Sequence, residues 1–203
     1  MPGRVLLMCG SLQSVSANRS ALDVAASYLR QVDDVDVEDA EGLAPIPPFN
    51  PDSVIEPGGV VERLRDQIRG CDVVMIAAPE YAGGLAGALK NALDWIVGSG
   101  ELYSKLVVVL SAGTSGGVHA RRDLIQTLTW QGAHVVGELG ITAPRTKSDS
   151  RGRYTDSVTI GEIQRLAQLA LEARTLDAEE RLKLVTAITS SAGIDPGHIA
   201  PVT

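Results

Sequence analysis

The feature that most constrains this fold is the alternation of short apolar runs with longer amphipathic stretches along the chain. The run Asp72–Ala78 is almost entirely apolar, which is typical of a strand buried on both faces of a parallel sheet. The stretch Leu85–Val97 repeats apolar residues at helical spacing. Because parallel strands need crossover connections, the alternation predicts a doubly wound, three-layer α/β/α sandwich.

The same periodicities place the individual elements and two irregular loops. The predicted strands are Val5–Cys9, Asp36–Glu38, Asp72–Ala78, Leu106–Ala112 and Ala133–Val136. The predicted helices are Ala17–Gln31, Gly59–Arg69, Leu85–Val97, Val118–Gln131, Ile160–Thr175 and Ala178–Ser191. The proline-rich segment Gly42–Pro57 and the polar segment Thr142–Val158 are expected to be loops. We expect one domain over residues 1–176 and a helical extension over residues 177–203, which packs on its own domain or on a neighbouring subunit.

Composition narrows the class of protein. The chain has 203 residues, 44% of them hydrophobic, which is enough for a full core. Its net charge of −7 and the lack of a Lys/Arg stripe argue against nucleic-acid binding. No apolar run approaches the roughly 18 residues of a membrane span. The two cysteines, Cys9 and Cys71, predict neither a disulfide framework nor a metal site, and we expect both as buried thiols in a reducing cytoplasm.

The loop Gly10–Asn18 joins the first predicted strand to the first predicted helix. In such a connection the backbone N–H groups and the helix N-terminus direct positive charge at one spot. Ser11, Ser16 and Asn18 add neutral hydrogen-bonding groups. The loop therefore predicts a phosphate site, although a simple turn in which Ser16 or Asn18 only caps the helix is the alternative.

Two further loops are predicted at the same edge of the sheet. In Pro79–Gly84, the glycines leave the backbone open to a planar ligand, and Tyr81 supplies an aromatic ring. Ser111–Gly117 is a second Gly-rich loop, after the fourth strand. Each loop alone is compatible with an ordinary turn. Because ligands of such sheets bind outside the carboxyl ends of the strands, the three loops together predict one binding site.

These motifs resemble a known family. The loop Gly10–Asn18, the tripeptide Pro79-Glu80-Tyr81 and the helical segment Leu89–Trp95 are together similar to the NADPH-dependent FMN reductases, over roughly residues 4–175. This flavodoxin-like group includes quinone, azo and chromate reductases. The resemblance implies a five-stranded parallel sheet in the order 2-1-3-4-5, FMN as cofactor, and NADPH or NADH as hydride donor. It also implies a quinone-like or free-flavin acceptor and a homodimer or homotetramer.

The resemblance implies no catalytic side chain, because the flavin N5 carries the chemistry, and no metal ligand. The FMN contacts that it implies are Ser11, Gln13, Ser16, Ala17, Asn18, Pro79, Glu80, Tyr81, Ala82, Gly83, Ser111, Gly113, Thr114 and Gly116.

The chain departs from the family pattern at three of its positions. Gln13 stands where the family usually has arginine, and Ala82 and Gly84 stand where it usually has asparagine and serine. A charged hydrogen bond contributes about 1.5–3 kcal/mol, so its loss weakens phosphate binding about tenfold or more. Arg19 is a candidate to supply the missing positive charge, unless its side chain points to solvent. We therefore expect a flavin that exchanges easily.

Other interpretations remain open on the sequence alone. Gly113–Gly117 matches the G-x-S-x-G pattern of a serine hydrolase, with Ser115, then Asp177 or Asp195, then His198 in triad order. Another interpretation is a flavodoxin-like module that binds or senses a ligand without turnover. The segment 149–153 is expected to be a solvated loop, or to reach the 2′-phosphate of the coenzyme through Arg151 or Arg153.

Overall fold

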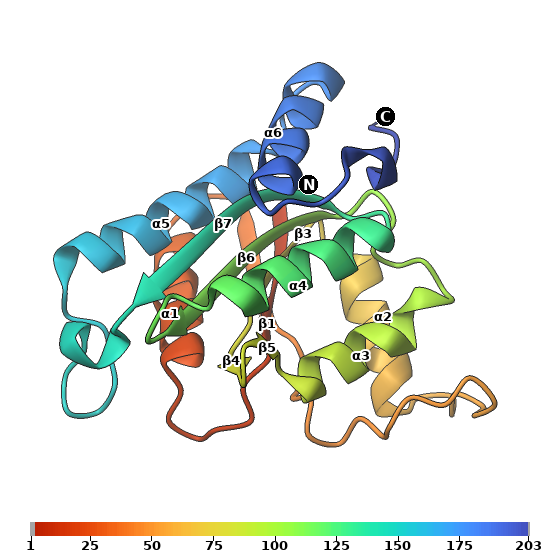
Figure 1. Ribbon diagram of the computed structural model, residues 1–203, viewed down its shortest axis with the longest axis horizontal. Coiled ribbons are helices and arrows are strands. Elements are labelled where there is room, and N and C mark those ends of the chain that lie inside the picture. The colour runs from red at the N-terminus through yellow and green to blue at the C-terminus, as the bar shows by residue number, and fades with distance from the viewer. Residues whose placement is uncertain (1–2, 203) are drawn as a thin grey trace.

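The computed structural model describes residues 3–202 and contains a five-stranded parallel sheet in the order β2-β1-β3-β6-β7. Counted along the chain, the sheet strands β1, β2, β3, β6 and β7 are the first to the fifth. The predicted order 2-1-3-4-5 is therefore confirmed. Figure 1 shows the helices on both faces of this sheet. The strands are β1 (Gly3–Cys9), β2 (Val35–Asp39), β3 (Val73–Ala77), β6 (Leu106–Gly113) and β7 (His134–Thr142).

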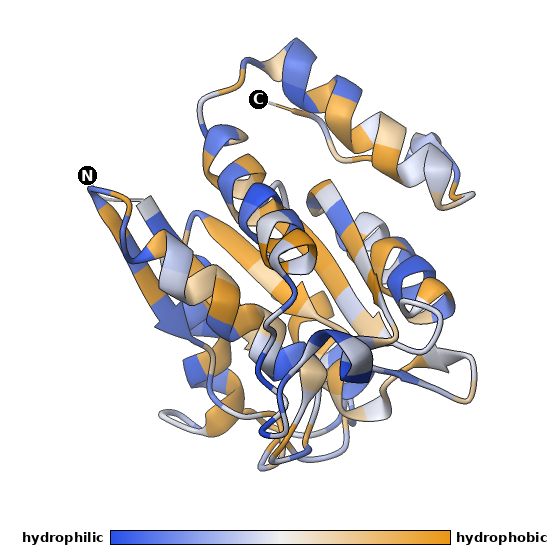
Figure 2. Cartoon of the chain, turned by 90° about the vertical axis from the view of Figure 1, so that its left-hand side faces the viewer, coloured by the Kyte–Doolittle hydropathy of each residue, from blue (hydrophilic) through white to orange (hydrophobic). Residues whose placement is uncertain are grey.

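Each face of the sheet carries its own hydrophobic cluster. One cluster packs α2 (Val60–Gly70), α3 (Gly87–Val97) and α4 (Val118–Trp130) on the sheet. The other packs α1 (Ala17–Leu29) and α5 (Ser157–Glu172) on the opposite face. Strand β3 is fully buried, as its apolar sequence predicts. Figure 2 shows largely apolar strands between helices that are apolar on one side only.

The C-terminal helix α6 (Ala178–Ser191) packs on its own chain, which is one of the two packings left open by the sequence. Asp177 caps it through a reciprocal capping box with Glu180. Its buried residues are Val185 and Thr189, and it lies against β7, the edge strand of the sheet. The helix therefore covers an edge that would otherwise be free to pair with another strand.

Several predicted boundaries were wrong, most of all that of the fifth strand. It was expected to end at Val136, but β7 continues to Thr142 in register with β6. Gly137 and Gly140 interrupt the apolar pattern, Gly137 where leucine side chains of α5 pack on the strand and Gly140 where the backbone of another loop leaves no room for a side chain. A Cβ on Gly137 would stand 2.9 Å from Leu169 Cδ2, and one on Gly140 would stand 2.9 Å from the Gly116 oxygen.

Smaller corrections follow from local interactions. Helix α5 begins three residues earlier than predicted because Asp156 caps it by accepting a hydrogen bond from Thr159 N. Helix α3 begins at Gly87 because the preceding residues form a hairpin, β4 (Glu80–Tyr81) with β5 (Gly84–Leu85), which the sequence did not predict. Two short 3-10 turns, η1 (Pro144–Lys147) and η2 (Pro196–His198), lie within predicted loop and tail.

The predicted bounds of α6 are confirmed, and the remaining helices and strands differ from prediction by one or two residues at their ends. Cys71 is buried as expected, whereas Cys9 is partly exposed because it ends β1 beside an open loop. Within residues 3–202, no helix is long and apolar enough to cross a membrane.

Candidate functional site

The three predicted loops converge at the carboxyl edge of the sheet, where hydrogen bonds join each to its neighbour (Figure 1). Gly10 N donates to the Ala77 oxygen at 2.8 Å, and Ala78 N donates to the Leu110 oxygen at 2.8 Å. The Ser111 hydroxyl donates to the Ala78 oxygen. The backbone ends of β1, β3 and β6 therefore form one continuous, rigid rim.

The first loop, residues 10–16, presents mostly backbone and neutral side chains. Gln13 N donates to Ser11 Oγ at 3.3 Å, which curls the loop, and residues 12–15 are exposed. Ser16 is buried and caps α1 by accepting from Arg19 N at 3.4 Å. The loop therefore lies over a helix N-terminus with its amides near the surface, which suits an anion. We call residues 10–16 the phosphate loop.

Asn18 was expected to contact a ligand, but its side chain is hydrogen-bonded to the backbone of β6. Its side chain is only 4% exposed, and it pairs with the backbone of Ala112 in both directions. Asn18 Nδ2 donates to the Ala112 oxygen at 3.2 Å, and Asn18 Oδ1 accepts from Ala112 N at 2.9 Å. Asn18 thus fixes α1 to the end of β6, two elements that lie 94 positions apart in sequence.

The phosphate loop contains no cation of its own. Gln13 is exposed, and Arg19 does not supply the missing charge, because it is held between two carboxylates. Its guanidinium lies 2.6 Å from Asp39 and 2.8 Å from Asp23. A cavity of about 290 Å³ lies between this loop and residues 40–44, and both Glu41 and the paired Arg19 are among the residues that line it. The phosphate loop itself therefore offers an anion only dipoles and hydrogen bonds.

The second loop is the β4–β5 hairpin, whose two-residue turn is Ala82-Gly83. Both residues have positive φ, 51° and 72°, which is the geometry of a type I′ turn. A Cβ on Gly83 would meet no atom within 4 Å, so the turn is open to a close approach. Pro79 is buried at its base, and Tyr81 is 51% exposed beside it. The exposed aromatic ring and bare backbone suit a flat ligand.

Glu80 holds this hairpin to α4. Its carboxylate accepts hydrogen bonds from His119 N at 2.7 Å and from Ala120 N at 3.1 Å, in the first turn of α4. The helix begins after Gly117, which has no side chain to cap it, so Glu80 provides the cap from another element. Asp123 completes the attachment by accepting from Leu85 N at 3.2 Å.

The third loop, residues 113–117, is shaped by close backbone packing. Ser111 is fully buried under it, and a Cβ on Gly117 would stand 1.8 Å from Ser111 Oγ. Gly116 is also buried, whereas Thr114 and Ser115 are exposed. Near Gly113, a Cβ would meet only Gly117 N, at 3.8 Å. The rim therefore has open backbone at Gly83 and Gly113, which leaves room for a flat ligand to approach.

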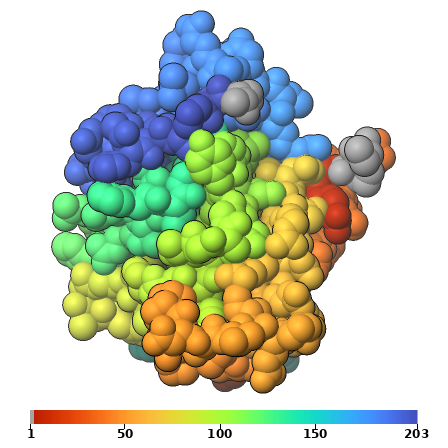
Figure 3. Space-filling model, turned by 90° about the vertical axis from the view of Figure 1, so that its right-hand side faces the viewer, coloured from red at the N-terminus to blue at the C-terminus, as the bar shows by residue number. Residues whose placement is uncertain are grey.

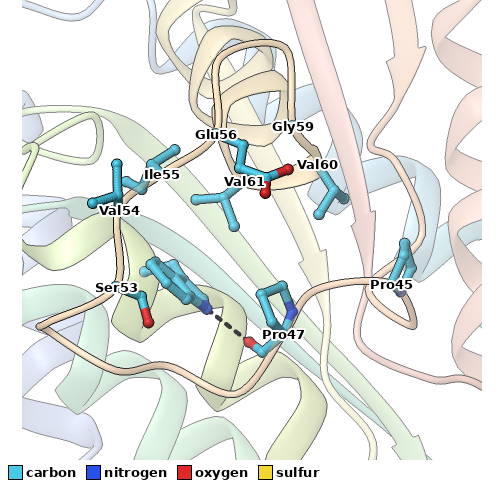
Figure 4. Close-up of a pocket in the computed structure, with 10 residues that line it drawn as sticks. Pro45, Pro47, Ser53, Val54, Ile55, Glu56, Gly59, Val60 and Val61 are labelled. Carbon is cyan, nitrogen blue, oxygen red and sulfur yellow. Dashed lines mark hydrogen bonds between the residues drawn. The ribbon is translucent and has the colours of Figure 1, made fainter.

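The helical motif in α3 contacts the proline-rich loop, a role the sequence did not reveal. Asn91 Oδ1 accepts from Phe49 N at 2.7 Å, and Asn91 Nδ2 donates to the Pro47 oxygen at 2.9 Å. Trp95 Nε1 donates to the same oxygen at 2.8 Å, drawn as the dashed line in Figure 4. Lys90 pairs with Asp94 at 2.6 Å, as their spacing predicts.

Figure 3 shows the proline-rich loop, in orange, beside α3 on the surface. Together with the start of α2 it encloses a cavity of about 420 Å³. None of the residues lining this cavity belongs to the phosphate loop, the hairpin or the third loop. The cavity is therefore separate from the rim.

The serine-hydrolase arrangement is contradicted by the fold. Ser115 lies just before α4, and its hydroxyl is 3.5 Å from Glu80 Oε1. His198 stacks on Trp130, the last residue of α4, with ring centroids 4.1 Å apart. The helix that separates them is about 20 Å long at 1.5 Å per residue. Asp177 and Asp195 serve as N-caps of α6 and η2, so these residues form no triad.

The comparisons with known proteins agree with this geometry. A family model described as NADPH-dependent FMN reductase matches residues 3–146. An NAD(P)H-dependent FMN reductase of Pseudomonas aeruginosa is 35% identical over 173 residues, covering 81% of this chain and 91% of the relative. An NAD(P)H:quinone oxidoreductase of Solanum tuberosum is 31% identical over 184 residues, covering 85% and 93%.

A solved structure adds support for the fold. The flavoenzyme NAD(P)H:acceptor oxidoreductase FerB of Paracoccus denitrificans superposes with a TM-score of 0.65 at 22% identity. The match covers 84% of this chain and 98% of that one.

Proposed function

Since the chain belongs to the NADPH-dependent FMN reductase family, we propose that it is an FMN-dependent NAD(P)H oxidoreductase. Its acceptor is a quinone-like molecule or free flavin. The observation that carries this proposal is the continuous rim, on which the phosphate loop, the hairpin and the third loop lie side by side with open backbone at Gly83 and Gly113. Bound FMN supplies the redox chemistry, accepting a hydride from NAD(P)H and passing two electrons to the acceptor.

The chain's own residues bind and orient the cofactor. We assign the FMN phosphate to the phosphate loop, with Ser11, Gln13, Ser16 and Ala17 at its backbone and side-chain donors. The ring is assigned to Pro79, Tyr81, Ala82 and Gly83 on one side and to Gly113, Thr114 and Gly116 on the other. Asn18, Glu80 and Ser111 are positioning residues here, because their polar atoms already bind the loops to each other.

The flavin is proposed to exchange readily with solution. Gln13 carries no charge, and Arg19 is neutralised by Asp23 and Asp39, so neither of them supplies the charged hydrogen bond of the usual family pattern. An FMN dissociation constant well above the low nanomolar range is expected from fluorescence titration of the apoprotein. A low nanomolar value would contradict this part of the proposal.

The proposed activity is tested by a steady-state assay. The protein, supplied with FMN and a quinone, is expected to oxidise NADPH continuously, and the same assay with NADH measures the coenzyme preference. FMN binding without turnover would instead support the non-catalytic, ligand-binding alternative. The free thiols Cys9 and Cys71 suit a reducing compartment, and we propose the cytoplasm.

We further propose that the protein is a homo-oligomer whose subunits meet over α3 and α4. A groove of about 680 Å³ lies between these helices. Val97 and Trp130 line it and are 57% and 64% exposed, so both apolar side chains are available to a neighbouring subunit. Val97→Glu is expected to shift the molar mass, measured by light scattering after size exclusion, towards the monomer. An unchanged oligomer would exclude this surface.

A further inference from the structure

The loop between β7 and α5, residues 143–156, is basic on an otherwise acidic chain. It carries Arg145, Lys147, Arg151 and Arg153, while the chain as a whole has a net charge of −7. We call residues 143–156 the basic loop. Such a concentration of positive charge beside a predicted phosphate site favours binding of an anionic ligand.

The basic loop is built around a single carboxylate. Asp149 accepts hydrogen bonds from Arg151 N at 2.9 Å and from Arg153 N at 3.0 Å, and it pairs with the Arg153 guanidinium at 2.7 Å. The pKa of Asp149 is lowered most by the backbone hydrogen bond from Arg153 and next by the hydrogen bond from the Arg153 side chain. Ser148 and Tyr154 close the loop through a β-bridge. Arg153 is thus neutralised, and the shape of the loop is fixed.

The other three cations of the loop make no ion pair or side-chain hydrogen bond with any described residue, although Lys147 lies near Asp156, whose pKa is lowered by its hydrogen bonds with Thr159 and further by the Lys147 charge. Of the 18 lysines and arginines, six make no side-chain hydrogen bond or ion pair with any residue that the structure describes. Half of these six lie in the basic loop. The six are Arg4, Arg122, Arg145, Lys147, Arg151 and Arg165.

The basic loop adjoins the proposed FMN site on two sides. Gly152 packs against the phosphate loop, so that a Cβ at this position would stand 3.2 Å from Val15 Cγ1. At the other end, Ala143 N donates to the Gly113 oxygen at 3.1 Å, and Thr142 forms a β-bridge with Ser115. The loop therefore borders both the phosphate loop and the third loop of the rim.

We propose that Arg145, Lys147 and Arg151 recognise a phosphate monoester at the border of the phosphate loop, in place of the arginine that Gln13 replaces. This inference rests on the proposed function. A phosphate monoester dianion reaches the site from two sources, the 5′-phosphate of FMN and the 2′-phosphate of NADPH. Neutralisation by unpaired guanidinium and ammonium groups would stabilise either one.

The test removes the three charges together and measures ligands with and without the phosphate. Apoprotein carrying Arg145→Ala, Lys147→Ala and Arg151→Ala is titrated with FMN against riboflavin, and with 2′,5′-ADP against 5′-AMP. A variant carrying Arg4→Ala, Arg122→Ala and Arg165→Ala is the matched control, because it loses the same charge from unpaired positions elsewhere.

About tenfold weaker binding of FMN with riboflavin unchanged would identify the flavin phosphate as the ligand. The same loss for 2′,5′-ADP with 5′-AMP unchanged would identify the coenzyme phosphate, and the KM for NADPH should then rise while that for NADH does not. If both phosphate-dependent ratios stay within about twofold of wild type, or if the control loses as much, the inference is wrong. Wild-type protein that binds neither FMN nor NADPH would contradict the proposed function itself.

Discussion

At the scale of single residues, the site is held together by side chains whose roles are indirect. Asn18, Glu80 and Ser111 belong to motifs that resemble direct cofactor contacts, yet each is hydrogen-bonded to the backbone of a segment distant in sequence. The sequence reveals that these polar residues occur beside glycines at strand ends. It does not reveal their partners, because those lie on elements distant in the chain.

Glu80 offers a direct test of this indirect role. Glu80→Ala is expected to lower the free energy of unfolding by about 1–2 kcal/mol, since two amides at the start of α4 lose their acceptor. Glu80→Gln should lose less, because its amide oxygen still accepts a hydrogen bond. Urea unfolding of both variants measures the difference. Equal stability of Glu80→Ala and wild type would show that the cap contributes nothing.

The hairpin turn is suboptimal at Ala82. Its φ of 51° lies in the left-handed region, which disfavours alanine and which asparagine adopts more readily. Ala82→Asn should therefore raise the free energy of unfolding by about 0.5–1 kcal/mol. Gly83→Ala, at φ 72°, is the opposite control and should destabilise the protein. Thermal melting of the two variants checks the opposite signs.

His134 gives a pH dependence with a defined direction. Burial lowers the pKa of this histidine, although its Nε2 lies 3.1 Å from the Ala200 oxygen, a contact that favours the charged form. Because protonation is disfavoured in the folded state, the unfolded chain binds more protons and stability falls as the pH drops below about 6.5. Unfolding at pH 7.5 and pH 5.5 should show a larger loss for wild type than for His134→Gln. An equal loss would remove His134 as a cause.

At the scale of elements, periodicity predicts the sheet well and the loops poorly. The apolar run of β3 and the helical spacing of α3 place those elements, because each buries a continuous face. Strand β7 extends beyond its apolar run because Gly137 and Gly140 serve close packing. The β4–β5 hairpin escapes prediction because two-residue strands have no periodicity, and their attachment to α4 is tertiary.

The proline-rich loop depends on α3 for its order. Asn91 binds both Pro47 and Phe49, so Asn91→Ala is expected to release residues 45–58 while lowering the free energy of unfolding by about 1–2 kcal/mol. Limited proteolysis followed by mass spectrometry should then find faster cleavage in this segment. Lys90→Ala, which removes only an exposed ion pair with Asp94, is the control and should be cleaved like wild type.

At the scale of the whole molecule, the doubly wound sheet brings together loops at residues 10–16, 79–84 and 113–117, which lie far apart in sequence. The alternation of strands and helices predicts this convergence, and the motifs predict its chemistry. The distribution of charge is less evident from the sequence. Arg19 becomes unavailable only when β2 places Asp39 beside it, and the basic loop meets the phosphate loop only through the packing of Gly152.

The central claim is that this rim binds FMN and uses it to move electrons from NAD(P)H to an acceptor. Anaerobic titration of the FMN-reconstituted protein with NADPH, followed by flavin absorbance, tests it most directly. We predict that about one equivalent of NADPH bleaches the flavin bands and that added quinone restores them. Protein that fails to bind FMN, or bound flavin that NADPH and NADH both leave oxidised, would contradict the account.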